Sequence, residues 1–103
     1  MVETIIEKWK LHLGLTDWII ITKQIVDTDS IDYNDQYYFI GIERDFKNKK
    51  GIIYHDIPLK EIDICHELLH IRYPETLFPY LNHNQYEEWI DKKSYKLLEN
   101  EKV

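Results

Sequence analysis

Apolar residues at the start of the chain recur with the period of a helix. They follow the i, i+3, i+4, i+7 spacing that gathers side chains on one helical face: Val2, Ile5, Ile6, Trp9 and Leu13. Gly14 comes directly after this pattern, and glycine is the residue that most often ends a helix. The pattern predicts an N-terminal helix with one buried face.

Three short runs after this helix favour β-strands. An Ile-rich run covers Trp18 to Val26, and the polar turn residues of Asp27 to Asp35 separate it from an aromatic and Ile-rich run over Gln36 to Arg44. A second turn, Lys47 to Gly51, leads into a short strand over Ile52 to His55. Three strands joined in this way predict a small three-stranded antiparallel sheet.

Prolines delimit the next helix. Pro58 suits the first helical turn, because the amide hydrogen that proline lacks has no partner there. The predicted helix ends at about Arg72, since Pro74 disfavours a helical conformation of Tyr73.

A last helix follows a loop framed by Pro74 and Pro79. Asn82 or Asn84 is suited to cap it, and the helix is expected to run through Leu98. The predicted order is helix, three strands, helix, loop and helix, which is an α+β fold.

Length and charge restrict the class of protein. The 103 residues suit a single domain over 1–103. Thirteen basic and nineteen acidic residues give a net charge of −6, which argues against binding to nucleic acid or to anionic membranes. The single cysteine cannot form an internal disulfide, and no apolar run approaches the roughly 20 residues of a membrane span. No signal-peptide pattern is visible, so the expected location is cytoplasmic.

The motif that carries chemistry lies in the second predicted helix. His66, Glu67 and His70 form an HExxH pattern, in which two histidines at i and i+4 project from one face and can share a zinc ion. Glu67 lies beside that face, where its carboxylate can take a proton from a metal-bound water. Alternatively, both histidines are ordinary polar residues of a partly buried helix. The apolar neighbours favour zinc, because two unpaired histidines among them would be costly.

A catalytic zinc site usually has three protein ligands and leaves a fourth position to water. Cys65 is next to His66 in sequence but turned by about 100° around the helix, so we expect it in the core. The third ligand is expected from the last helix. There Glu87 lies at the edge of the apolar face, whereas Glu88 points nearer to solvent with Lys92 as its i+4 partner.

The carboxylates of Glu87 and Asp91 repel each other unless a positive charge lies nearby. A metal ion held by Glu87, with Asp91 orienting one of the histidines, removes this repulsion. Two alternatives stay open: Glu88 is the ligand, or both glutamates are solvated acids on an amphipathic helix.

These residues resemble those of gluzincin metallopeptidases, in which an HExxH helix is followed by a glutamate on a later helix. The segment Glu61 to Tyr73 and the ExxxD pattern of Glu87 and Asp91 are similar to catalytic motifs of integral-membrane prenyl-protein and heat-shock metallopeptidases. Those proteins have several membrane helices, whereas the short length of this chain resembles the minigluzincins, soluble single-domain relatives of about this size. The resemblance implies a zincin-like fold.

The resemblance also implies a role for each motif residue. His66, His70 and Glu87 would bind one Zn²⁺ per chain, Glu67 would be the general base and acid, and Asp91 would support a ligand. It further implies a latent, zymogen-like state in which the C-terminal segment 96–103 covers a cleft. That cleft would belong to the same molecule or, in a homodimer formed by segment exchange, to a second one.

Two further expectations concern the substrate. A hydrogen-bond donor for the tetrahedral oxyanion would come from His83, Tyr95 or Tyr73. The strand Gly51 to His55 would offer a free edge to an extended peptide, or would be an ordinary sheet edge.

Two classes of function are compatible with this sequence. The first is a zinc-dependent peptidase that hydrolyses peptide or protein substrates by a metal-activated water, with Glu67 as general base and acid. The alternative is a non-catalytic zinc-binding structural or regulatory module, which would unfold when zinc is lost. Neither hypothesis involves nucleic acid or a membrane span.

Overall fold

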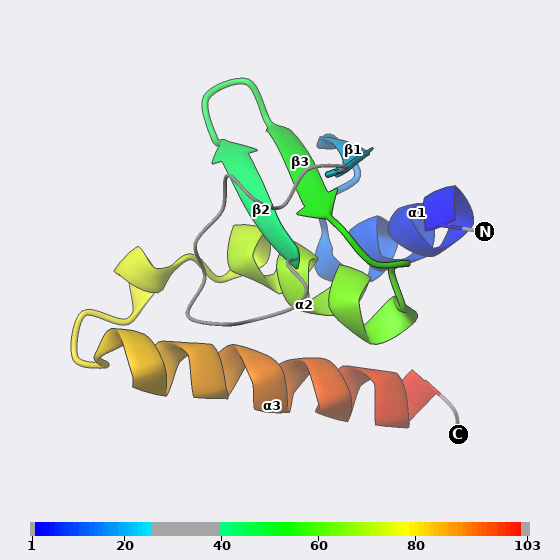
Figure 1. The fold of residues 1–103 in the computed structure, drawn as a ribbon. Coiled ribbons are helices and arrows are strands. Elements are labelled where there is room, and N and C mark those ends of the chain that lie inside the picture. The colour runs from blue at the N-terminus through cyan, green and yellow to red at the C-terminus, as the bar shows by residue number, and fades with distance from the viewer. Residues whose placement is uncertain (1, 26–39, 102–103) are drawn as a thin grey trace.

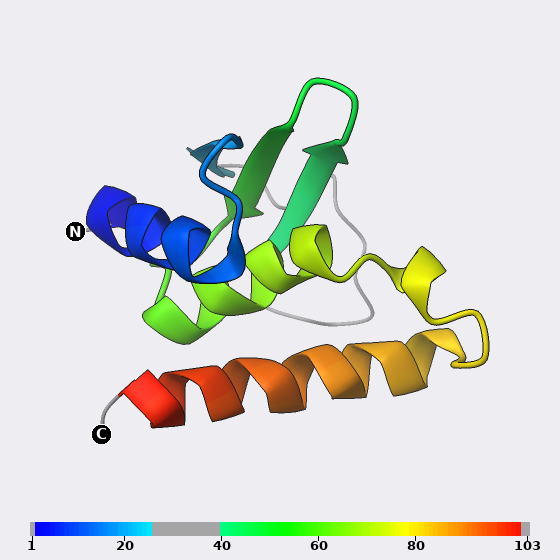
Figure 2. The same ribbon diagram turned by 180° about the vertical axis from the view of Figure 1, so that it is seen from behind.

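The helix that carries the HExxH pattern lies at the centre of the computed structural model, which describes residues 2–25 and 40–101. In chain order the elements are α1 (Val2–Leu13), β1 (Ile19–Gln24), β2 (Ile40–Asp45), β3 (Lys50–His55), α2 (Glu61–Arg72), the 3₁₀ helix η1 (Glu75–Leu77) and α3 (His83–Glu101). The sheet lies on one side of α2 and α3 on the other, with α1 beside α2 (Figure 1, Figure 2). The predicted α+β class is confirmed.

The sheet is mixed, so the prediction of an antiparallel sheet is wrong. Its strand order is β1-β3-β2, with β2 antiparallel to β3 and β1 parallel to β3. The short turn after β2 forces an antiparallel pair with β3. The longer connection between Gln24 and Ile40 lets β2 lie beyond β3 rather than beside β1.

The turn between β2 and β3 starts the third strand earlier than predicted. The Asp45 carboxylate accepts hydrogen bonds from the backbone N–H and the side-chain amide of Asn48, at 3.1 and 2.8 Å. Lys49 then takes the left-handed conformation with φ 53°, and β3 begins at Lys50. Gly51, expected in the turn, is therefore a strand residue, and a Cβ there would lie 2.9 Å from Ile20 Cδ1.

Parts of the predicted strands lie outside the described residues. This holds for Val26, for the turn Asp27 to Asp35 and for the first four residues of the strand Gln36 to Arg44. Within the described residues, β1 and β2 occur inside their predicted ranges, except that β2 ends one residue later at Asp45.

Side-chain caps fix where the last two helices begin. The Asp63 carboxylate accepts a hydrogen bond from the Lys60 backbone N–H at 2.9 Å, so α2 begins after Lys60 rather than at Pro58. At α3, the Asn82 side chain accepts from the Gln85 backbone N–H at 2.8 Å, and the Gln85 side chain accepts from Asn82 at 2.9 Å. Of the two predicted caps, Asn82 is therefore the one used.

The core forms where α1 and α3 pack on opposite sides of α2. Fully buried residues come from all three helices and include Trp9, Leu68 and Ile90. Cys65 is also fully buried, as predicted. The Trp9 indole Nε1 donates a hydrogen bond to Glu61 Oε2 at 2.8 Å, which joins α1 to the first turn of α2.

No helix in residues 2–25 and 40–101 combines the length and apolar character that a membrane crossing requires. The last helix extends beyond the predicted end at Leu98 to Glu101, so residues 96–101 of the predicted latency segment are part of α3.

Candidate metal centre

The two histidines of the HExxH pattern face the first half of α3. The helices run in opposite directions (Figure 1, Figure 2), which places the earlier histidine, His66, beside the later α3 residue, Asp91. His70, one turn further along α2, lies beside Tyr86 and Glu87. The 3₁₀ helix η1 reverses the chain between α2 and α3, so residues 16 to 25 positions apart in sequence meet here.

Three side chains converge as one group that could hold a metal ion: His66, His70 and Glu87. The two Nε2 atoms are 3.3 Å apart. The Glu87 carboxylate oxygens lie 3.7 Å from His66 Nε2 and 3.6 Å from His70 Nε2. Two imidazole nitrogens and one carboxylate are a common ligand set for a divalent transition metal.

A chain of hydrogen bonds fixes the ring of His70. The Tyr86 hydroxyl donates its single hydrogen to the Tyr73 carbonyl oxygen, at 2.6 Å. The same hydroxyl oxygen lies 3.1 Å from His70 Nδ1, and it can only accept there because its hydrogen is already used. His70 therefore carries its hydrogen on Nδ1, which leaves the Nε2 lone pair directed at His66 and Glu87.

The carboxylate of Asp91 likewise determines which ring nitrogen of His66 carries a hydrogen. Asp91 Oδ1 lies 3.1 Å from His66 Nδ1, and an ionised carboxylate only accepts hydrogen bonds, so Nδ1 carries a hydrogen. In the neutral ring the Nε2 lone pair then faces the Nε2 lone pair of His70. Two lone pairs at this distance repel each other, and a metal ion between the rings would remove the repulsion.

Burial sets the ionisation of two groups in this site. Desolvation, followed by the effect of His66, lowers the pKa of His70 to about 4, so His70 is neutral near pH 7 and retains a lone pair for a metal. Glu67 is only 6% exposed. Its burial, with a smaller contribution from Glu87, raises the pKa of its carboxyl to about 8. A carboxyl group with such a pKa can both take and give a proton near neutrality.

The metal group opens into a cleft of about 300 Å³. Its walls are the facing sides of α2 and α3, the edge strand β2 and the loop after α2; the lining residues are Ile40, Gly41, Ile42, Arg44, His66, Glu67, His70, Glu75, His83, Tyr86 and Glu87. The expectation of a free edge at Gly51 to His55 is wrong, because β3 is the central strand and pairs on both sides. The strand that lines the cleft is β2, which among the described residues pairs with β3 alone.

The remaining predicted residues lie at different distances from the cleft. His83 is at its rim, where its Nδ1 lies 3.0 Å from Glu75 Oε1.

The side chains of Tyr73 and Tyr95 are not among the lining residues: Tyr73 packs edge to face against Trp89, and Tyr95 is 62% exposed on α3. Glu88 forms the predicted surface ion pair with Lys92, at 2.9 Å, and does not join the metal group.

Sequence reasoning missed several residues of the cleft, and two of them, Tyr86 and Arg44, contact His70. Tyr86 directly precedes Glu87 on the last helix, and no spacing in the sequence indicates its contact with His70. Arg44 lies at the end of β2, where its guanidinium Nη1 donates a hydrogen bond to the His70 carbonyl at 3.0 Å. Both contacts join residues that are far apart in sequence, and no local spacing encodes them.

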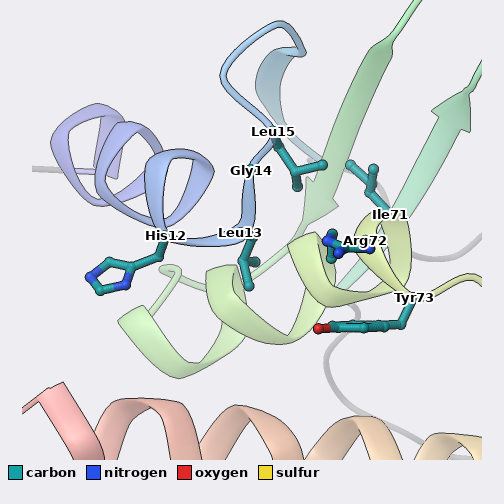
Figure 3. A pocket seen from close by; sticks show the side chains of 7 residues that line it. All are labelled: His12, Leu13, Gly14, Leu15, Ile71, Arg72 and Tyr73. Atoms are coloured by element: carbon teal, nitrogen blue, oxygen red, sulfur yellow. The ribbon is translucent and has the colours of Figure 1, made fainter.

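A second and larger cavity, of about 590 Å³, lies away from the metal group, between the ends of α1 and α2. His12 lies at one end of this cavity, and Arg72 and Tyr73 lie at the other (Figure 3). Its lining contains a single histidine and no carboxylate, so it has no ligand set for a metal ion. Of these two cavities, the smaller cleft is the one lined by the metal group.

Comparisons of this chain with family models, with curated proteins and with solved structures give no match.

Proposed function

We propose that this protein is a zinc-dependent peptidase whose zinc ligands are His66, His70 and Glu87. The observation that carries the proposal is the convergence of the two Nε2 atoms and the Glu87 carboxylate at 3.3 to 3.7 Å. A tetrahedral zinc ion with Zn–N distances of about 2.0–2.1 Å would place its ligand nitrogens about 3.3–3.4 Å apart. The distance between the two Nε2 atoms fits this geometry. The Glu87 carboxylate oxygens lie a few tenths of an ångström farther from these nitrogens than the nitrogens lie from each other.

The hydrogen bonds around the ligands support the same assignment. Tyr86 and Asp91 hold a hydrogen on the Nδ1 atoms of His70 and His66, so that both Nε2 atoms present lone pairs. Histidine ligands of zinc are commonly oriented in this way by an outer hydrogen-bond partner. We propose this orienting role for Asp91, in agreement with the resemblance to gluzincins, and for Tyr86.

Zinc bound here would supply a water of lowered pKa, near 7, and would polarise the substrate carbonyl. Glu67 is proposed to take the proton of that water and to pass it to the nitrogen of the departing amine. Its place next to His66 on α2 and in the lining of the cleft supports this role. His83, at the cleft rim, is the sequence-predicted oxyanion donor with the best position, and its pKa is raised by the hydrogen bond with Glu75, which favours a protonated ring.

The substrate proposed for this site is a peptide in extended conformation. The cleft is bounded by β2, whose main-chain groups can pair with an added strand. A small α+β domain with an HExxH helix and a glutamate on the following helix supports a zincin-like fold of the gluzincin type and a relationship to the minigluzincins.

We also propose that the segment 96–103 controls access to the cleft. Residues 96–101 continue the helix that carries Glu87, and a rise of about 1.5 Å per residue directs them away from it. Residues 96–101 therefore do not reach the cleft of their own molecule while α3 stays intact. Exchange between two molecules, in a homodimer, is therefore the mode that the helix favours.

The test is a cleavage assay with a mixed peptide library on zinc-loaded protein, read by mass spectrometry. Wild type is expected to cut peptides and to lose activity with a chelator, whereas Glu67→Gln retains zinc without cutting. Zinc binding by a protein that cuts no peptide, even after the C-terminal segment is truncated at residue 95, would favour the non-catalytic zinc-binding module. Turnover by Glu67→Gln equal to wild type would exclude the mechanism.

A further inference from the structure

One cation of the cleft, Arg44, forms no ion pair with a carboxylate of the described residues. Arg44 is an exposed residue in the lining of the cleft, which has no other lysine or arginine. Its guanidinium donates a hydrogen bond to the His70 carbonyl and forms a cation–π contact with Phe46, at 5.8 Å from the ring centroid. Neither contact neutralises its charge.

The acids of the cleft are engaged elsewhere. Glu87 faces the two histidines, and Glu75 is paired with His83. Glu67 is buried beside the metal group. Among residues 2–25 and 40–101 no carboxylate forms an ion pair with this guanidinium, and the charge of Glu67 acts on it only at longer range.

Two elements hold Arg44 close to the reacting groups. Alternation along β2 directs Ile40, Ile42 and Arg44 to the same face of the sheet, and all three line the cleft. The hydrogen bond from Nη1 to the His70 carbonyl then ties the guanidinium to the helix of the metal ligands. A guanidinium has five N–H donors, and the remaining ones have no hydrogen-bond partner among residues 2–25 and 40–101, so they can bind a ligand in the cleft.

We propose that Arg44 recognises a carboxylate of the peptide substrate, adjacent to the bond that is cut. The inference rests on the proposed peptidase function and specifies its substrate class. A guanidinium matches a carboxylate through two parallel hydrogen bonds, which gives such a pair both strength and direction. A peptide that lies along β2 passes Arg44, and its carboxylate is either the C-terminal group or an Asp or Glu side chain.

The test measures binding to zinc-loaded protein by calorimetry and uses two pairs of peptide hydroxamates. The members of the first pair differ in a C-terminal carboxylate or amide, and those of the second differ in an Asp or Asn side chain. In at least one pair the carboxylate form is expected to bind roughly tenfold more tightly, since a charged hydrogen bond contributes about that factor. A preference in the first pair identifies an exopeptidase-type substrate, and a preference in the second identifies an acidic side chain.

Variants of the protein test whether Arg44 causes the preference for the carboxylate form. Arg44→Gln is expected to bind both members of a pair equally, with zinc content unchanged, and Arg44→Lys is expected to retain part of the preference. Arg72→Gln is the matched control, because it removes the same charge from an exposed arginine at the other cavity and is expected to behave as wild type.

Three outcomes would overturn the inference. Equal binding within both pairs by wild-type protein, which needs no variant to fold, overturns it and leaves the metal site intact. A preference that persists in Arg44→Gln also overturns it. Wild-type protein that binds neither zinc nor any hydroxamate overturns the proposed function itself, and this inference with it.

Discussion

The hydroxyl of Tyr86 joins the ring of His70 to the main chain of Tyr73, the residue that caps the C-terminal end of α2. It lies 3.1 Å from His70 Nδ1 and donates to the Tyr73 carbonyl at 2.6 Å, and Tyr86 is only 1% exposed. A single hydrogen atom on this hydroxyl thus determines which nitrogen of His70 is free to bind a metal. The position of the Tyr86 side chain is set by the packing of α3 on α2.

Replacing Tyr86 by phenylalanine should weaken metal binding while the fold persists. Tyr86→Phe removes the acceptor for His70 Nδ1–H and leaves the Tyr73 carbonyl without its donor, which costs about 1–3 kcal/mol of stability. Zinc affinity should fall by roughly 10–100-fold, as for other outer partners of histidine ligands. Competition with a chromophoric chelator measures this change. Tyr95→Phe, at an exposed position on the same helix, is the control, and an equal loss there would contradict the role of Tyr86.

The zinc content of variants should distinguish the histidines of the cleft that bind zinc from His83, which does not. Elemental analysis is expected to give about one zinc per chain in wild type and little in His70→Ala, because two ligands alone hold zinc weakly. His83→Ala should retain zinc, since His83 pairs with Glu75 and is not part of the metal group. Retention of full zinc content by His70→Ala would exclude the proposed ligand set.

Removal of zinc should loosen the site without unfolding the domain. The core of buried residues from α1, α2 and α3 is built from apolar contacts, and Ile64, Leu68 and Ile90 in it are fully buried. Far-ultraviolet circular dichroism is expected to change little on addition of a chelator, while the melting temperature decreases by an amount that depends on zinc concentration. A chain that unfolds when zinc is removed would instead behave as a structural zinc module.

The metal-free protein should lose stability between pH 6.5 and pH 8. The pKa of Glu67 is about 8 in the folded protein and near 4.5 in a free glutamate, so the folded state binds more protons in this range and is destabilised as the pH rises. The lowered pKa of His70, about 4 against 6.5, acts in the opposite direction but only below pH 6.5.

The expected loss is up to about 2 kcal/mol over this interval, at about 1.4 kcal/mol per pH unit for one proton. Urea unfolding of chelator-treated protein at several pH values measures it. Glu67→Gln carries no titrating carboxyl at this position and should show a much weaker dependence in the same interval, to which the raised pKa of the exposed His83 contributes. A wild-type stability that rises from pH 6.5 to 8 would show that Glu67 is already ionised in the folded state.

Local patterns were sufficient to predict most elements and the first half of the site. The helical period of Val2 to Leu13 and the cap of α3 depend on residues a few positions apart. The first helix occurs as predicted, and the cap is Asn82, one of the two predicted residues. The i, i+4 spacing of His66 and His70 places both rings on one face of α2 by helix geometry alone. Helix geometry also places Glu87 at the edge of the apolar face of the last helix, and for that reason the sequence favoured Glu87 over Glu88 as the third metal ligand.

The sequence by itself therefore determined the helices, the strands and the residues able to bind a metal, because these follow from backbone geometry over short distances. Only the tertiary structure decided the mixed order of the sheet, with β2 rather than β3 at the cleft. It also decided that Tyr86 and Arg44 meet His70. These contacts result from how whole faces of α2, α3 and the sheet pack together, and the free energy of that packing is shared among many residues that no local pattern singles out.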